Sequence, residues 1–491
     1  MILKTKRILS IIFMGSVFAF MMSSPALAAA VGGNSPAPDL PTWSIIPFVG
    51  MLLSIAVFPL VKPHWWERNL LLVAAFWSLL FLVPFAVSFG FGQMSHHLLE
   101  IILLDYVPFI ILLWGLFAVS GGIVIKGSFA GSPKVNLLLL IAGTLLASWF
   151  GTTGASMLFI RPLLRANRWR EKKAHVVVFF IFLVCNIGGG LTPVGDPPLF
   201  LGFLRGVPFF WTFNMFPMML FNIILLLGAF FLIDRRLYKK ELANGRSPVC
   251  DAENESLPKE KLKIEGLHNL IFIVMIVGAI VLNGVVTKFP FFADAVTGAL
   301  HGIHIYDGIV LPYNSILQIL IIALAGALSI ITTKKKLRAE NEFNWHPIKE
   351  VASLFIGIFI TMIPALAILQ GHGSEMGLTE PWQFFWSTGL LSSFLDNAPT
   401  YLVFLTTSGT LGATAGVSTM VGIIDPMILL AVSAGAVFMG ANTYIGNAPN
   451  FMVRSIAEKD GVKMPSFFGY MGWSLCFLIP LFILDTVFFL L

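Results

Sequence analysis

The sequence predicts an all-α polytopic membrane protein with two inverted-topology repeats, each with a re-entrant hairpin and a broken transmembrane helix. Of the 491 residues, 57% are hydrophobic and only 11% are charged, whereas soluble domains carry about 25% charged residues. Many runs reach the roughly 20 apolar residues that a bilayer span needs. Four runs are interrupted by glycine, proline or polar residues, in the same order in each half. This composition excludes a soluble enzyme and a nucleic-acid binder, and the lipid bilayer is the first expected partner.

Residues 1–30 are predicted to form a secretory signal peptide. Three basic residues within the first seven positions precede an apolar run at 8–22, and the small-residue pattern Ala-Leu-Ala ends at Ala28. This order is typical of a signal sequence, and we expect cleavage after Ala28. An uncleaved first helix is the alternative.

Whole transmembrane helices are predicted wherever an apolar run continues without interruption. These runs lie near 43–61, 69–90, 104–125, 209–233, 267–286, 308–332, 351–369 and 466–490. The interrupted runs lie at 135–160, 174–204, 384–407 and 425–451. The polar stretch 234–266 has mixed charge, an Asn-Gly pair and prolines, and we expect it to be a cytoplasmic linker between the halves.

The distribution of lysine and arginine predicts the topology. Basic residues cluster after every second crossing, while the intervening loops near 91–100, 287–307, 371–382 and 408–424 carry only one lysine, Lys288. Positive loops lie on the cytoplasmic side of a membrane. One consistent topology follows if the runs 135–160 and 384–407 enter and leave on the same side, as re-entrant hairpins. We therefore expect a multi-pass protein of a bacterial-type inner membrane.

Two halves, 43–233 and 267–491, are expected to be structural repeats. Each contains a hairpin, then a broken helix, then a whole span, and an odd number of crossings between the hairpins inverts the second half. Paired, interrupted segments in inverted halves are typical of secondary transporters with a site near the membrane midplane. The segments that align are Ser148–Gly154 with Ser393–Pro399, and Thr192–Pro198 with Thr443–Pro449.

The interruption around Asp196 has the composition of a hard-cation site. Pro197 and Pro198 lack backbone N–H groups, so carbonyl oxygens one turn earlier lose their helical partners. Glycines at 188–190 allow close approach of the backbone to a ligand, and oxygen ligands suit a small hard cation. The residues predicted to bind the ion or substrate are Asp196, Asp396, Asn397, Thr152, Thr153, Thr192, Asn442, Thr443 and Asn447.

Each predicted site residue also has a simpler explanation. Asp196 or Asp396 could cap a helix, and the asparagines and threonines could satisfy free backbone groups. A charged group at membrane depth nevertheless costs several kcal/mol, which makes the two aspartates functional candidates. Either role is compatible with ion binding.

The two aspartates occupy different positions in the two halves. Asp196 aligns with Asn447, and Asp396 aligns with Gly151. If the halves fold together, both carboxylates face one central cavity, where their repulsion favours a proton on one of them. A site that holds either protons or a cation could exchange one for the other by alternating access.

The sequence Gly189–Pro198 resembles the broken-helix signature of NhaD-type sodium/proton antiporters, and Ser393–Pro399 is similar to their second hairpin tip. The resemblance covers roughly residues 45–490 and extends to the ion transporter superfamily, which includes citrate and dicarboxylate carriers. It implies a scaffold and a transport subdomain that moves like an elevator, often in a homodimer. It also implies that Asp196, Asp396 and Asn397 bind Na⁺ or Li⁺ and protons, which are transported ligands. No cofactor is expected.

The main alternative is a citrate-type or dicarboxylate transporter, coupled to a cation. Hydroxyl and amide groups could hold a carboxylate substrate, whereas an aspartate at a hairpin tip would repel it. Charge therefore favours a cation as the substrate. An intramembrane aspartic protease would need glycine at position 193, where this chain has Pro193, and a passive channel would differ by showing no exchange stoichiometry.

Overall fold

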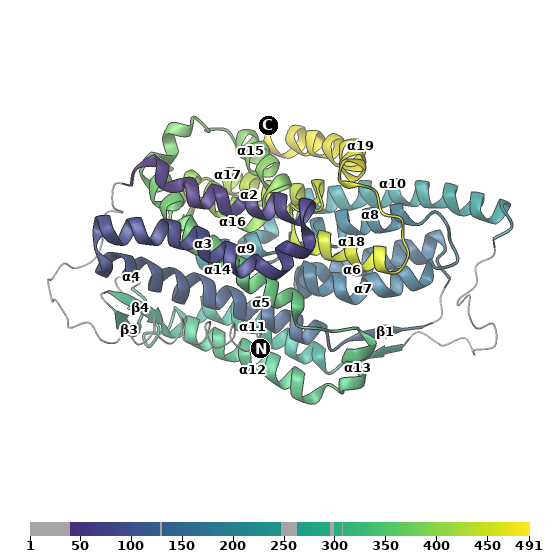
Figure 1. The fold of residues 1–491 in the computed structure, drawn as a ribbon, viewed down its shortest axis with the longest axis horizontal. Coiled ribbons are helices and arrows are strands. Elements are labelled where there is room, and N and C mark those ends of the chain that lie inside the picture. Colours follow the sequence, from purple (N-terminus) through teal and green to yellow (C-terminus); the bar gives the residue numbers. More distant parts are fainter. Residues whose placement is uncertain (1–39, 128–129, 247–262, 295–298, 307) are drawn as a thin grey trace.

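The computed structural model describes residues 40–127, 130–246, 263–294, 299–306 and 308–491. Helices dominate this part of the chain, and nine of them are long and apolar enough to cross a membrane. They run roughly parallel to the long axis of the molecule (Figure 1). The prediction of an all-α polytopic membrane protein is thereby confirmed. The predicted signal peptide, residues 1–30, lies outside the described residues.

Helix positions follow the apolar runs closely. The helices of the first half are α2 (Ile46–Val61), α3 (Pro63–Phe89), α4 (Phe91–Glu100), α5 (Val107–Ser120), α6 (Pro133–Phe150), α7 (Thr152–Ala166), α8 (Ala174–Leu183), α9 (Pro197–Leu204) and α10 (Phe216–Ala243). Those of the second half are α11 (Asn269–Val286), α12 (Tyr313–Thr332), α13 (Lys335–Glu340), α14 (His346–His372), α15 (Pro381–Phe394), α16 (Asn397–Gly409), α17 (Pro426–Met439), α18 (Ala448–Lys459) and α19 (Phe467–Asp485).

The third span begins earlier than the sequence indicates. The apolar run predicted near 104–125 is part of a continuous helical segment at 91–120, in which a π-helical stretch, Ile101–Tyr106, joins α4 to α5. Because α4 contains polar residues, hydropathy alone does not indicate that the helical segment begins there. The helix ends at Gly121, where the backbone turns toward strand β1 (Val124–Lys126).

The helices form two groups that contact each other. In the first group, α2 and α3 pack against each other and against α14, while α5 packs against α11 and α12. In the second group, α6 packs against α7 and α10, and α15 packs against α16 and α17. Contacts of α14 with α16 and of α5 with α7 join the groups. We call these groups the outer body (α2–α5, α11–α14) and the core body (α6–α10, α15–α19).

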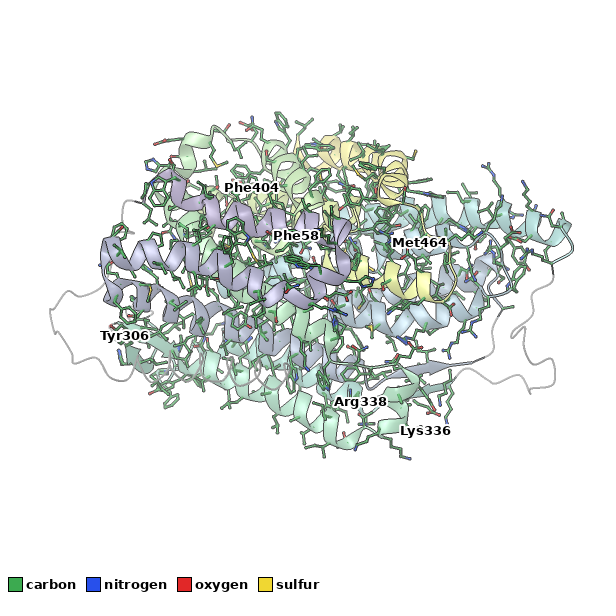
Figure 2. The ribbon with its side chains drawn as sticks, in the orientation of Figure 1. Phe58, Tyr306, Lys336, Arg338, Phe404 and Met464 are labelled. Atoms are coloured by element: carbon green, nitrogen blue, oxygen red, sulfur yellow. The ribbon has the colours of Figure 1, made fainter. Side chains whose placement is uncertain are left out.

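Short antiparallel strand pairs cap the ends of the helices. Strand β1 pairs with β2 (Lys263–Glu265), β3 (Gly302–Tyr306) pairs with β4 (Ile309–Pro312), and β5 (Val417–Thr419) pairs with β6 (Gly422–Ile424). Figure 2 shows Tyr306 of β3 and Lys336 of α13 toward opposite ends of the helices. Lys336 belongs to a basic stretch at 334–338, so the end that carries it is the predicted cytoplasmic end.

The stretch predicted as a linker, 234–266, is partly structured. Helix α10 extends into the first part of this stretch, as far as Ala243, and strand β2 lies near its other end. Residues 247–262 lie outside the described part. The helix continues because Asp234 is buried and has partners. Its Oδ1 accepts from Arg170 Nη1 at 2.5 Å and lies 2.8 Å from His175 Nε2, and its Oδ2 accepts from Asn136 Nδ2 at 3.0 Å.

An ion-pair network holds this end of the molecule together. Lys126 Nζ in β1 lies 2.6 Å from a carboxylate oxygen of Glu340 and 3.0 Å from one of Glu265. Hydrogen bonds to Glu340 and then Glu265 raise the pKa of Lys126. The side chains of both pairs remain in part accessible to solvent, so each pair contributes little to stability, but together they connect α13 to the strand pair.

Candidate functional site

Four helix interruptions meet around the carboxylate of Asp196. Its Oδ1 accepts hydrogen bonds from Thr152 Oγ1 at 2.9 Å and from Asn447 Nδ2 at 3.1 Å. Its Oδ2 accepts from Asn397 Nδ2 at 2.7 Å. These donors stand at the starts of α7, α16 and α18, and Asp196 precedes α9. We call these four residues the Asp196 cluster. The structure thus brings together predicted residues from both halves.

The local sequence explains why the helices are interrupted at these positions. Gly151, between α6 and α7, has φ = 74°, a conformation that disfavours other residues. Pro197 and Pro198 open α9, where a missing N–H costs no helical hydrogen bond. Gly195 lies so close to the Gly189 carbonyl that a Cβ at this position would collide with it. The breaks therefore require glycine and proline.

Asp196 is not a simple helix cap. It occupies the N-cap position of α9 but makes no side-chain cap hydrogen bond there. Its side chain instead turns toward donors from the other three interruptions, and the residue is only 1% exposed. Buried carboxylates of this kind are costly unless their oxygens are hydrogen-bonded. The three uncharged donors supply those bonds.

Asp396 takes a different position. Its Oδ1 accepts from the backbone nitrogen of Ala398 at 3.1 Å, so it caps α16, as the simpler explanation proposes. Its side chain is half-buried and lines a cavity of about 920 Å³, together with Thr153 and Asn447. Capping and exposure to a cavity coexist in the same residue.

The cavity extends from the predicted cytoplasmic end to the Asp196 cluster. Charged residues that line it include Arg161, Arg165, Glu342 and Lys459, and Arg161 Nη2 lies 3.2 Å from Glu342. Residues from the outer body and from the core body both contribute to the wall. A small solute could therefore approach Asp396 between the two bodies.

The remaining predicted threonines hold each hairpin against its broken helix. Thr192 Oγ1 donates to the backbone oxygen of Ser148, and Thr443 Oγ1 donates to that of Ser393 at 2.5 Å. These pairs lie at aligned positions of the two halves. Thr192 and Thr443 do not bond to Asp196, so their role in this structure is to satisfy backbone groups.

Asn442 and Asn397 each present an unpartnered oxygen. Asn442 Nδ2 donates to Ser393 Oγ at 2.9 Å, while its Oδ1 is buried without a partner among the described residues. Asn397 Oδ1 is likewise buried and unpartnered, although its Nδ2 donates to Asp196. A buried oxygen that lacks a donor has unused capacity to accept from a ligand or a water or to bind an ion. Asn397 places that oxygen beside the Asp196 carboxylate.

Two site residues escape the sequence analysis. Asn186 and Asn450 are both 0% exposed. Asn186 accepts from Asn447 Nδ2 and donates to Asn450 Oδ1, so it links Asn450 to the Asp196 cluster. Asn186 is the one asparagine in the run 174–204, and Asn450 is the next-to-last residue of the run 425–451. The signal that indicates them is an amide at membrane depth, where a polar group needs a partner.

Other buried acids lie outside the site. Arg205 Nη2 donates to Asp105 Oδ2 at 2.7 Å, and Asn222 Nδ2 donates to Asp485 Oδ2 at 2.9 Å. Among the described residues, ion pairs of buried or half-buried aspartates involve Asp105, Asp234 and Asp460 rather than the two site aspartates. The Asp196 cluster therefore pairs one carboxylate with neutral groups alone.

Comparison with known proteins agrees with this architecture. The chain matches the model of a family described as "Putative citrate transport" over residues 37–490. A search of curated proteins finds no match. The family match includes all four interruptions and supports the expected ion transporter superfamily; the NhaD-type specificity stays a prediction. Because the match covers nearly the whole chain, the protein belongs to this citrate transport family and is a multi-pass membrane transporter.

Proposed function

We propose that the protein is a secondary active antiporter that exchanges sodium or lithium for protons at the Asp196 cluster. The observation that carries this proposal is a buried carboxylate whose hydrogen-bond partners are a hydroxyl and two amides, and which has no cationic partner in the part of the chain that the structure describes. Such a carboxylate can be neutralised by a proton or by a small cation, and the two compete for it.

Electrostatics favour a cation over an anion at this position. Asp196 and Asp396 stand at neighbouring interruptions, and neither is neutralised by an ion pair in the described part of the chain. An organic anion would meet repulsion from both. Carboxylate and amide oxygens, including the unpartnered Asn397 Oδ1, suit sodium or lithium as hard cations. We propose Asp196, Asp396 and Asn397 as the cation ligands, with protons as the counter-substrate.

The cavity supports an alternating-access cycle. It leads from the predicted cytoplasmic end toward Asp396 along the boundary between the outer body and the core body. Movement of the core body along the outer body, like an elevator, would transfer the cluster to the opposite side. In this proposal the repeats are 43–233 and 267–491, the protein forms a homodimer in a bacterial-type inner membrane, and transport needs no cofactor.

Citrate-type transport coupled to a cation is the second candidate. The family description favours it, and a cavity of about 920 Å³ exceeds what a bare cation needs. Arg161 and Arg165 line the same cavity and could attract an organic anion. In this version the Asp196 cluster would bind the coupling cation.

Transport by the purified protein separates the two candidates. The protein is reconstituted into acid-loaded vesicles that contain a pH-sensitive dye, and sodium, lithium, potassium or citrate is added outside. We expect internal alkalinisation with sodium or lithium alone, and its loss in Asp196→Asn and Asp396→Asn. Citrate uptake without sodium/proton exchange would favour the second candidate.

A matched control distinguishes loss of the site from loss of the fold. Asp485→Asn removes another buried carboxylate of the same chain, which bonds to Asn222 and not to the cluster. We expect this variant to retain exchange. If it lost exchange to the same extent as Asp196→Asn, the assignment of the activity to the Asp196 cluster would fail.

A further inference from the structure

We infer that Asn186 is a positioning residue: with Asn450, it holds the Asn447 amide so that its nitrogen faces the Asp196 carboxylate. This inference rests on the proposed function, because it concerns how the same site is built. Asn186 and Asn450 are fully buried and come from the broken helices of different halves. Among the described residues neither side chain hydrogen-bonds to Asp196, so each acts through Asn447.

Backbone carbonyl groups determine how Asn450 and Asn186 are oriented, because a carbonyl can only accept. Asn450 Nδ2 donates to the carbonyl oxygens of Gly440 and Thr443, both at 2.9 Å. Its Oδ1 therefore faces Asn186 and accepts from Asn186 Nδ2 at 2.8 Å. The same nitrogen of Asn186 donates to the Ile181 carbonyl at 2.8 Å. Rotating either amide would place its oxygen against two acceptors.

The orientation of Asn447 follows from its three neighbours. Its Nδ2 lies 3.0 Å from the Cys185 carbonyl oxygen, 3.3 Å from Asn186 Oδ1 and 3.1 Å from Asp196 Oδ1. All three are acceptors that share the two hydrogens of this nitrogen, and the orientation of Asn186 makes its oxygen one of the three. Asn447 therefore acts as a hydrogen-bond donor to Asp196 and offers no oxygen to a cation there.

Asn397 differs from Asn447 because its side-chain oxygen is available to a ligand. Its nitrogen donates to Asp196 Oδ2 at 2.7 Å, but its oxygen has no partner among the described residues. The two amides of the cluster therefore have different roles. Both stabilise the negative charge of Asp196 by donating a hydrogen bond, but only Asn397 also offers an oxygen ligand. The chain of amides from Asn450 through Asn186 to Asn447 links the two broken helices at the ion site.

Loss of Asn186 is expected to weaken cation binding. Without it, Asn447 loses one acceptor and its link to Asn450, so its hydrogen bond to Asp196 is less well placed. The Asp196 carboxylate is then less stabilised, and the cation competes less well with protons. We expect Asn186→Ala to raise the KM for sodium about fivefold, the effect of one net hydrogen bond, with the maximal rate nearly unchanged.

A double-mutant cycle tests whether Asn186 acts through Asn447. The KM for sodium is measured in proteoliposomes for wild type, Asn186→Ala, Asn447→Ala and the double variant. We expect Asn186→Ala to raise the KM in the wild-type background and to have no further effect when Asn447 is alanine. Equal effects in both backgrounds, or no effect of the single variant, would overturn the inference.

Two further variants keep the test decisive. Asn450→Ala removes the partner that orients Asn186, and it replaces Asn186→Ala in the cycle if that variant does not fold. Asn222→Ala, a buried asparagine that bonds to Asp485 outside the site, should leave the KM unchanged. If wild type transports citrate and not sodium, the proposed function fails, and the same cycle measured with citrate still tests the positioning role.

Discussion

At the scale of single residues, Asp396 caps α16 and also lines the cavity, and substitution can separate these roles. Asparagine caps helices about as well as aspartate but carries no charge. Asp396→Asn should therefore keep a Tm near that of wild type while abolishing exchange. Asp396→Ala should abolish exchange and also lower stability by about 1 kcal/mol, measured by thermal unfolding in detergent. Exchange that survives in the asparagine variant would restrict Asp396 to a capping role.

The sequence predicts which polar residues gather at the site but not which hydrogen-bonding partner each of them has. Asp196, Thr152, Asn397 and Asn447 are found together as expected, because interrupted helices bring their ends to one place. Thr192 and Thr443 are bound instead to backbone oxygens of the hairpins. Donor and acceptor roles depend on three-dimensional neighbours, which sequence spacing does not contain.

Asn186 shows why part of the site escapes prediction. Its neighbours in the chain, Cys185 and Ile187, are apolar, and its partners Asn447 and Asn450 are more than 250 positions away. No local motif marks such a pairing. The same is true of Asp485, whose partner Asn222 lies in another helix.

At the scale of elements, the interruptions depend on glycines that permit close backbone approach. A Cβ at Gly195 would collide with the Gly189 carbonyl, and one at Gly446 would lie 2.6 Å from the Gly440 carbonyl. These are aligned positions of the two halves. The same close approach of a glycine to a carbonyl group occurs in both halves, which supports the predicted repeat.

Substitution of one glycine tests this role of the break. Gly195→Ala is expected to displace the Gly189 carbonyl and, with it, the backbone of Asp196, so exchange should be lost while the helices persist. Gly228→Ala in α10 is the matched control, because nothing lies within 4 Å of its added methyl group and alanine favours a helix by about 1 kcal/mol. Exchange rates and circular dichroism of both variants provide the measurement. Normal exchange by Gly195→Ala would contradict the argument.

Helices could be predicted from the sequence where an uninterrupted apolar run determines both their position and their length. The apolar runs near 43–61, 267–286 and 308–332 became helices with nearly the expected bounds. The helical continuation of α10 beyond residue 233 was missed, because its buried partners Arg170 and His175 come from another part of the chain. Tertiary contacts therefore extend a helix that composition ends.

At the scale of the whole molecule, the Asp105–Arg205 pair joins the outer body to the core body. Asp105 lies in the π-helical stretch before α5, and Arg205 follows α9. The cavity on the boundary between the bodies leads toward the predicted cytoplasmic end, and neither residue lines it. In an elevator-type cycle this pair would break whenever the core body moves.

Neutralising the pair should therefore favour departure from the present conformation. Ser455 lines the cavity, and a cysteine placed there in a background without Cys185, Cys250 and Cys476 reports its accessibility. We expect Asp105→Asn to reduce labelling by a membrane-impermeant maleimide in inside-out vesicles, relative to the unmodified pair. Asp485→Asn should leave labelling unchanged. Unaltered labelling in Asp105→Asn would mean that the pair does not hold this conformation.

In the proposed cycle a cation displaces a proton from Asp196, and proton release on cation binding measures this step directly. Purified protein in weakly buffered detergent solution is mixed with sodium, lithium or potassium chloride while the pH is recorded. We expect proton release with sodium and lithium, none with potassium, and none with any of these salts in Asp196→Asn. Undiminished release in Asp196→Asn, or no release by wild type with either cation, would contradict it.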